Sequence, residues 1–169
     1  DFEGKIDAES DFFYLIAVPA QGSQIDNFWD LEEDKLYSLL RKPPILRNMG
    51  WDLSVHYTEF PKPAGDNWEI MNGNRKILSV SKTGTVAAAG TLQEFLDWGT
   101  HQRDEEVKPI INAFAFVEYI DMYCHFLRNF TDHFMPKETK YQLIVGFNIR
   151  TGQQFQLRFT MGFLPKGNF

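Results

Sequence analysis

The chain has little cysteine, a deficit of positive charge and no long hydrophobic run. Its single cysteine, Cys124, excludes an internal disulfide and an all-cysteine metal site. The 17 lysines and arginines against 23 aspartates and glutamates give a net charge of −6, which argues against direct binding to nucleic acid or to anionic membranes. No apolar run reaches the roughly 18 residues that cross a bilayer, and no secretory signal is recognisable. We therefore expect a cytoplasmic protein that binds neither nucleic acid nor membrane.

Aromatic residues are frequent instead. The sequence contains 16 phenylalanines, 6 tyrosines and 4 tryptophans, which together make up 15% of the 169 residues. Aromatic side chains carry a large apolar area, so they either pack a dense core or form a binding surface. At 43% apolar and 24% charged, the composition is that of a globular domain, and we expect most of the rings in its core.

Hydropathy patterning predicts one α+β domain over residues 11–165, after a polar and acidic linker over residues 1–10. A short β-rich run at 11–20 predicts a buried strand. A helix of about three turns should start after Asp30, with a capping box, and end before Pro43. Residues 50–90 predict an antiparallel meander of about four strands, starting with the alternating stretch 51–58 and interrupted by an irregular, exposed loop at 60–67. Its later turns are expected at Asn72-Gly73-Asn74 and at Lys82-Thr83-Gly84.

The second half of the chain predicts the covering helices and a last hairpin. A helical signal starts at Thr91, and a longer helix is expected from Val107 to about Met135, where Pro136 should end it. Strands at 141–149 and 155–161 should form a hairpin around Thr151-Gly152. The fold class expected is an antiparallel sheet of about six to seven strands, packed on one side by the long helix, with one or two shorter helices. The long helix's predicted core stripe is Ile110, Phe114, Val117, Ile120, Cys124, Leu127 and Phe134. Phe130 or Thr131 bridges its last step, and Phe116, Met122 and Phe126 widen it.

Motifs of known chemistry are absent from the sequence. It has no Walker loop, no Gly-x-Ser-x-Gly elbow and no His-Glu-x-x-His pattern, so we predict no catalytic residue, metal or cofactor. Cys124 is expected in the core as an inert thiol. Asp121 and His125, four residues apart, fit the solvated face of a helix better than a metal site.

Ligand-binding candidates cluster around the proline-rich loop. Arginines clamp anions, and aromatic rings line pockets for planar groups. We therefore predict a site for a small anionic or planar ligand made by Arg41, Arg47, Trp51, His56 and Trp68.

One stretch resembles a known family. The run 41–47 (RKPPILR), the following Gly50-Trp51-Asp52-Leu53, and 77–86 with its Lys82-Thr83-Gly84-Thr85 turn are similar to a region found downstream of Schlafen-type AlbA_2 domains in bacterial proteins. The resemblance implies an accessory or sensing domain attached to a nucleic-acid- or nucleotide-related module outside this chain. It carries over no catalytic residue and no assigned ligand.

Three functions are compatible with these observations. The first is a non-catalytic sensing or interaction domain that regulates an N-terminal effector module or binds a partner protein. The second is a metal-dependent hydrolase or nuclease that uses Asp52, His56 and Glu69 on neighbouring strands. The third is a homodimerisation domain whose long helix packs an exposed aromatic stripe against a second copy.

Overall fold

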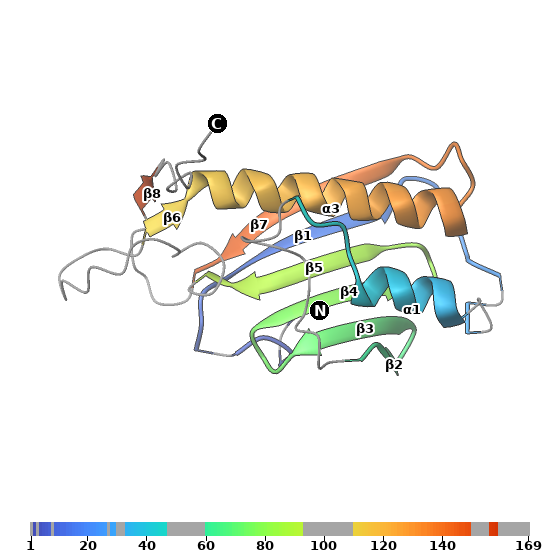
Figure 1. The fold of residues 1–169 in the computed structure, drawn as a ribbon, viewed down its shortest axis with the longest axis horizontal. Coiled ribbons are helices and arrows are strands. Elements are labelled where there is room, and N and C mark those ends of the chain that lie inside the picture. Colours follow the sequence, from blue (N-terminus) through green and yellow to red (C-terminus); the bar gives the residue numbers. More distant parts are fainter. Residues whose placement is uncertain are drawn as a thin grey trace, which may run out of the picture.

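The described part of the chain forms a six-stranded antiparallel sheet with the helices α1 and α3 on one face (Figure 1). The computed structural model describes residues 2, 4–7, 9–26, 28–29, 33–46, 60–92, 110–149 and 156–158. The sheet order is β2-β3-β4-β5-β1-β7, and β6 and β8 form a separate parallel pair. The elements are β1 (Phe12–Pro19), α1 (Glu33–Arg41), β2 (Lys62–Ala64), β3 (Asn67–Asn72), β4 (Lys76–Ser81), β5 (Val86–Thr91), β6 (Ile110–Asn112), α3 (Ala113–Phe134), β7 (Tyr141–Asn148) and β8 (Gln156–Arg158).

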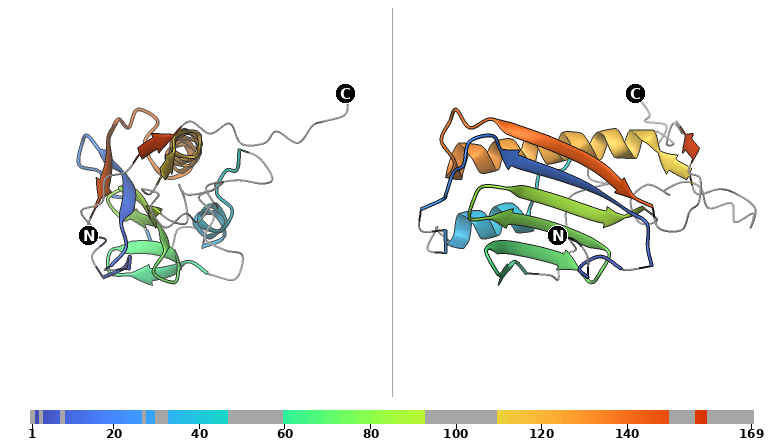
Figure 2. Two further views of the ribbon diagram at one scale, coloured as in Figure 1. Left: turned by 90° about the vertical axis from the view of Figure 1, so that its left-hand side faces the viewer. Right: turned by 180° about the vertical axis from the view of Figure 1, so that it is seen from behind.

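The predicted fold class is confirmed. An antiparallel sheet, a 22-residue helix and a shorter helix make up an α+β fold in the described part of the chain. Both helices lie on the same side of the sheet when it is viewed from its edge (Figure 2). Neither described helix is long and apolar enough to cross a membrane.

The meander from β3 to β5 follows the predicted turns. Gly73 joins β3 to β4 with a φ of 52°, and Gly84 joins β4 to β5 with a φ of 79°. Both values lie in the left-handed region, which glycine adopts without a Cβ penalty. The loop expected at 60–67 is less irregular than predicted, since β2 pairs there with β3. The strand expected at 51–58 and the helix expected after Thr91 lie outside the described residues.

β1 is a central strand, as its apolar run predicts, and it pairs with β5 on one side and β7 on the other. Alternate side chains separate onto two faces. Phe13, Leu15 and Ala17 are fully buried in the core under the helices. Tyr14 is only partly buried on the opposite face, beside a smaller apolar cluster.

The predicted core stripe of α3 is confirmed only in part. Met122, Phe126 and Phe130 are buried as expected. Phe114, Val117 and Cys124 are exposed, and Ile120, Leu127 and Phe134 are only partly buried. The buried face carries Ala113, Ala115, Tyr119, Met122, Tyr123, Phe126 and Phe130. Apolar residues surround much of this helix, so its sequence contains two overlapping stripes. The structure buries the one with the larger aromatic area.

One helix boundary and one strand pairing also differ from the sequence predictions. The long helix begins at Ala113 rather than Val107, because Ile110–Asn112 is the strand β6. The hairpin predicted between 141–149 and 155–161 is also wrong. β7 pairs with β1, and β8 pairs in parallel with β6. The alternation predicted both strands, but alternation alone does not choose a strand's partner.

Part of segment 1–10 packs on the sheet, where the sequence suggested a linker. Ile6 is 2% exposed and contributes to the cluster on the face away from the helices. The amide of Asp7 donates to the carbonyl of Asn74 at 2.9 Å, which fixes the segment beside the β3–β4 turn. The N-terminal segment (residues 2–7) is therefore part of the fold where it is described.

Candidate functional site

Two of the five predicted ligand-binding residues can be placed. The Arg41 guanidinium lies 4.7 Å from the centroid of the Phe60 ring, which stacks in turn on Tyr37. Trp68 is partly buried against the core under the helices, with its ring centroid 5.9 Å from that of Trp29. Arg41 and Trp68 thus have separate aromatic partners. Arg47, Trp51 and His56 lie outside the described residues.

Glu69 is the one member of the alternative metal site that can be placed, since Asp52 and His56 also lie outside the described residues. Within the described ranges, no three histidine, cysteine, aspartate or glutamate side chains gather as metal ligands would. Glu69 has a different environment, in a cavity on the face of the sheet away from the helices.

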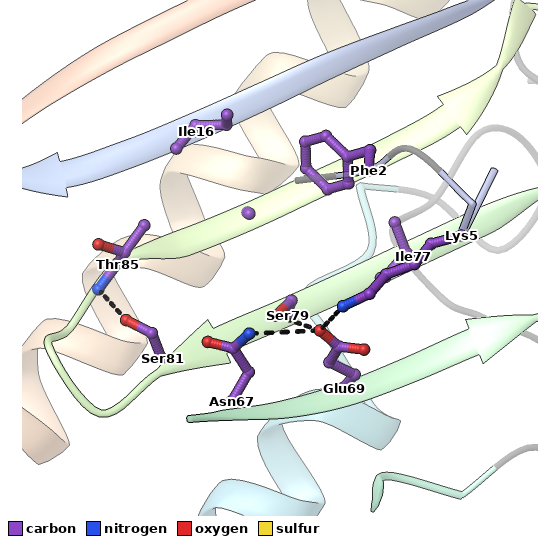
Figure 3. Close-up of a pocket in the computed structure, with 10 residues that line it drawn as sticks. Phe2, Lys5, Ile16, Asn67, Glu69, Ile77, Ser79, Ser81 and Thr85 are labelled. Carbon is purple, nitrogen blue, oxygen red and sulfur yellow. Dashed lines mark hydrogen bonds and ion pairs between the residues drawn. The ribbon is translucent and has the colours of Figure 1, made fainter. Parts of the chain in front are cut away.

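This cavity, which we call the Glu69 pocket, lies beneath the N-terminal segment and has a volume of about 170 Å³ (Figure 3). Sheet residues supply its floor and walls, and the N-terminal segment supplies one side. Its lining residues are Phe2, Lys5, Ile16, Asn67, Glu69, Ile77, Ser79, Ser81, Thr85 and Ala87.

The strand register explains why the sheet is hollow at this point. Glu69 is the cross-strand partner of Ser79, Ser79 of Ala87, and Ala87 of Ile16. These residues form a row on one face of the sheet, because directly paired residues point to the same side. Ser79 and Ala87 are small and stand between two longer side chains. The row therefore dips at its centre.

The Glu69 side chain is the buried charge of the pocket, with the residue 2% exposed. Its Oε1 accepts a hydrogen bond from Lys5 Nζ at 2.5 Å, and weaker ones from Asn67 Nδ2 and Ser79 Oγ at 3.4 Å each. Its Oε2 has no hydrogen-bond donor in the described part of the chain. Burying a carboxylate is costly unless it is paired, so Lys5 is the main compensation.

Lys5 reaches Glu69 from the N-terminal segment. Its side chain is 34% exposed, against 3% for that of Glu69, so the ion pair has one buried and one accessible partner. Within the segment, the Ile6 amide donates to the Phe2 carbonyl at 3.1 Å, and the hydrogen bond from the Asp7 amide to Asn74 fixes the segment beside the β3–β4 turn. Lys5 is therefore the pocket's accessible cation on a short, anchored piece of chain.

Hydroxyl groups form the other end of the pocket. Ser81 Oγ accepts a hydrogen bond from the Thr85 amide at 3.0 Å and lies 2.7 Å from Thr83 Oγ1. Both Ser81 and Thr85 line the cavity. Together with Lys5 and Glu69 they provide donors and acceptors on two sides of a partly apolar space, which is the usual composition of a small-molecule site.

A second cavity lies between the two helices, with a volume of about 660 Å³. Its basic residues Lys35, Lys42 and His133 are all exposed. His133 Nδ1 is hydrogen-bonded to the Asn129 carbonyl at 2.7 Å. Because this groove holds no buried charge, the Glu69 pocket is the better-built candidate site.

No known protein family, curated protein or solved structure matches this chain. The resemblance to the region downstream of AlbA_2 domains thus stays a prediction. What the chain binds has to be inferred from the chemistry of the Glu69 pocket.

Sequence reasoning considered Glu69 as a metal ligand and missed its pairing. The alternation in β3 does indicate that Glu69 and Trp68 lie on opposite faces. Lys5, however, is 64 residues away in the chain, and the polar run around it resembles a linker. No local pattern connects the two residues.

Proposed function

We propose that this chain is a non-catalytic sensing domain that binds a small zwitterionic ligand, such as a free α-amino acid, in the Glu69 pocket. The observation that carries the proposal is the Lys5–Glu69 ion pair, with Glu69 buried in the cavity and Lys5 accessible. The lining residues that the structure describes include no histidine or cysteine, and their one carboxylate is paired. This lining favours binding over catalysis.

A zwitterion matches the two charges better than the anionic or planar ligand that the sequence suggested. Its ammonium group would donate to Oε2 of Glu69, which no described residue hydrogen-bonds, and its carboxylate would accept from Lys5. A simple anion would meet the buried carboxylate, whose negative charge repels it. A volume of about 170 Å³ holds roughly six waters, which suits a ligand of amino-acid size.

Sensing follows from where Lys5 is attached. A ligand carboxylate competes with Glu69 for the Lys5 ammonium, so binding changes the contact that ties the N-terminal segment to the sheet. The segment would report occupancy to an N-terminal effector module or to a partner protein. A ligand can shift a conformational equilibrium only through such a difference in contacts between the two states.

Titration calorimetry with glycine, alanine and serine as probes tests the proposal. We expect binding of at least one of these, and none of ethylamine or acetate, each of which carries only half of the charge pair. Glu69→Gln should weaken binding by at least about tenfold, since a charge-assisted hydrogen bond is replaced by a neutral one. Asp66→Asn is the matched control, because Asp66 pairs with Lys82 at 2.8 Å outside the pocket.

Two results would reject the proposal. One is the absence of binding by all three probes at millimolar concentration. The other is binding that Glu69→Gln and Asp66→Asn weaken equally, because the ligand would then respond to overall charge and not to the pocket.

A further inference from the structure

The outer edge of β7 ends the sheet, and no described strand pairs with it. The strand runs for eight residues, Tyr-Gln-Leu-Ile-Val-Gly-Phe-Asn, without a charge or a proline. Protein sheets usually protect such an edge with a charged residue, a proline, a bulge or a very short strand. β7 contains neither a charged residue nor a proline, and with eight residues it is not a short strand.

Backbone geometry shows which groups the edge presents. The Ala20 amide donates to the Lys140 carbonyl at 2.8 Å, one step beyond the Pro19–Tyr141 pair. In an antiparallel ladder, hydrogen-bonded residues alternate along the strand. Even-numbered residues of β7 therefore bond to β1. The N–H and C=O groups of Tyr141, Leu143, Val145 and Phe147 point outward.

Apolar side chains are exposed on both faces of this edge. Leu143 and Val145 are each 42% exposed on the side of the helices, as is Phe147 at 39%. Ile144 is 39% exposed on the opposite side. Phe147 continues this surface onto α3, because its ring centroid lies 5.3 Å from that of Phe116.

The other edge of the sheet is protected. β2 has only three residues, Lys62, Pro63 and Ala64. The proline has no amide to donate, and the lysine brings a charge that pairing would desolvate. The sheet can therefore be extended from one side only.

We propose that β7 pairs antiparallel with β7 of a second copy of this chain, joining two sheets across a two-fold axis that passes through Ile144. This inference is independent of the ligand proposed above. In this register Tyr141 lies opposite Phe147 of the second copy, and Leu143 opposite Val145. Aromatic and β-branched cross-strand pairs of this kind stabilise antiparallel sheets.

A second copy suits the edge because the strand is complementary to itself. A two-fold axis requires one surface to face its own duplicate, and an uncharged, apolar strand does so without opposing like charges. The protected β2 edge closes the assembly at two copies. The exposed side chains offer roughly a few hundred Å² per copy, below the about 1,200 Å² of standard interfaces, so the dimer should be reversible.

Cysteine cross-linking tests both pairing and register. Ile144→Cys is made in a Cys124→Ser background, and the protein is oxidised mildly at micromolar concentration. Residues on the axis form a non-hydrogen-bonded pair with Cα atoms about 4.5 Å apart, a separation within the disulfide range. Gln142→Cys is the matched control on the same face and strand. Its two copies would lie about 13 Å apart.

The expected result is a disulfide-linked dimer that forms at least about tenfold faster with Ile144→Cys than with Gln142→Cys. Equal rates, or no cross-link in either variant, would overturn the proposal. Ile144→Lys supplies a second measurement, because two lysines on the axis repel each other. Sedimentation should show a concentration-dependent dimer for the unmodified chain and a monomer for Ile144→Lys, both with the same circular dichroism. A monomer at all concentrations, or open-ended assembly, would contradict it.

Discussion

The ring of Tyr14 lies directly across Gly146, its cross-strand partner in β7. A Cβ at Gly146 would lie 2.3 Å from Tyr14 Cζ and 2.4 Å from the hydroxyl oxygen, far inside van der Waals contact. The glycine thus gives the ring space on the last strand of the sheet. This contact joins the edge strand to the central strand β1.

Gly146→Ala should therefore destabilise the protein by about 1–3 kcal/mol, the usual cost of overpacking. Urea unfolding measures the change. Gly22→Ala is the control, because a Cβ at Gly22 meets nothing within 4 Å, and it should change stability little. Tyr14→Leu should reduce the penalty of Gly146→Ala by removing the ring. Equal penalties with and without the ring would contradict the explanation.

Tyr123 makes the buried polar contact of α3. Its hydroxyl donates to the Val86 carbonyl at 2.7 Å, and the residue is fully buried. Tyr123→Phe should cost about 1–3 kcal/mol, because the carbonyl loses its additional donor in the core. Tyr37→Phe should cost much less, since the Tyr37 hydroxyl has no hydrogen bond in the described part of the chain. Chemical denaturation of the two variants provides the comparison.

The same hydroxyl makes stability depend on alkaline pH. Burial raises the pKa of Tyr123 well above its usual value. The folded state then keeps a proton that the unfolded chain loses near pH 10, so the unfolding free energy falls as pH rises above about 10. Below that pH the contribution is fully present. The stability difference between the parent and Tyr123→Phe, measured from pH 8 to 11, should shrink with pH; a constant difference would refute this prediction.

Cys124 is exposed on α3, so the folded protein should react with iodoacetamide. Partial burial of the thiol sulfur against the helix surface raises its pKa, and the nearby Asp121 carboxylate adds to the rise. The thiolate is the reactive form, so the alkylation rate should keep rising beyond pH 9. Asp121→Asn should increase the rate at pH 8 only partly, because burial is the larger cause. Labelling that requires unfolding would show that the thiol is inaccessible.

Lys5→Met should leave the Glu69 carboxylate buried without its cation. The expected cost is about 1–3 kcal/mol, and Glu69→Gln should recover part of it in the double variant. Hydrogen exchange should also accelerate at the Ile6 and Asp7 amides, whose bonds hold the N-terminal segment. Unchanged exchange would mean that Lys5 does not anchor this segment.

The sequence determined the fold class and most element positions. A short apolar run located β1, alternation located β7, and the glycine-containing turns located the hairpins between β3 and β5. Pro136 correctly predicted the end of α3, which stops at Phe134. These features depend on neighbours a few residues apart, which a single sequence contains.

Tertiary structure decided which surfaces meet. Cys124 was expected in the core, but α3 buries its neighbour Tyr123 instead, because the sheet accepts only one of two apolar stripes. β7 was expected to pair with the strand after it, but it lies beside β1. The buried face of α3 and the partner of β7 both depend on contacts between segments that are distant in the sequence. Local periodicity carries no information about such contacts.

The candidate site is also a product of the tertiary structure. Glu69 is recognisable in the sequence as a polar residue on a strand, but its burial depends on Lys5 and on the small residues Ser79 and Ala87 in neighbouring strands. Patterns a few residues long therefore determined the strands, helices and turns of this protein. Only the packing of remote segments placed a carboxylate, a lysine and a hollow together, because a buried charge is stable only where the whole fold supplies its partner.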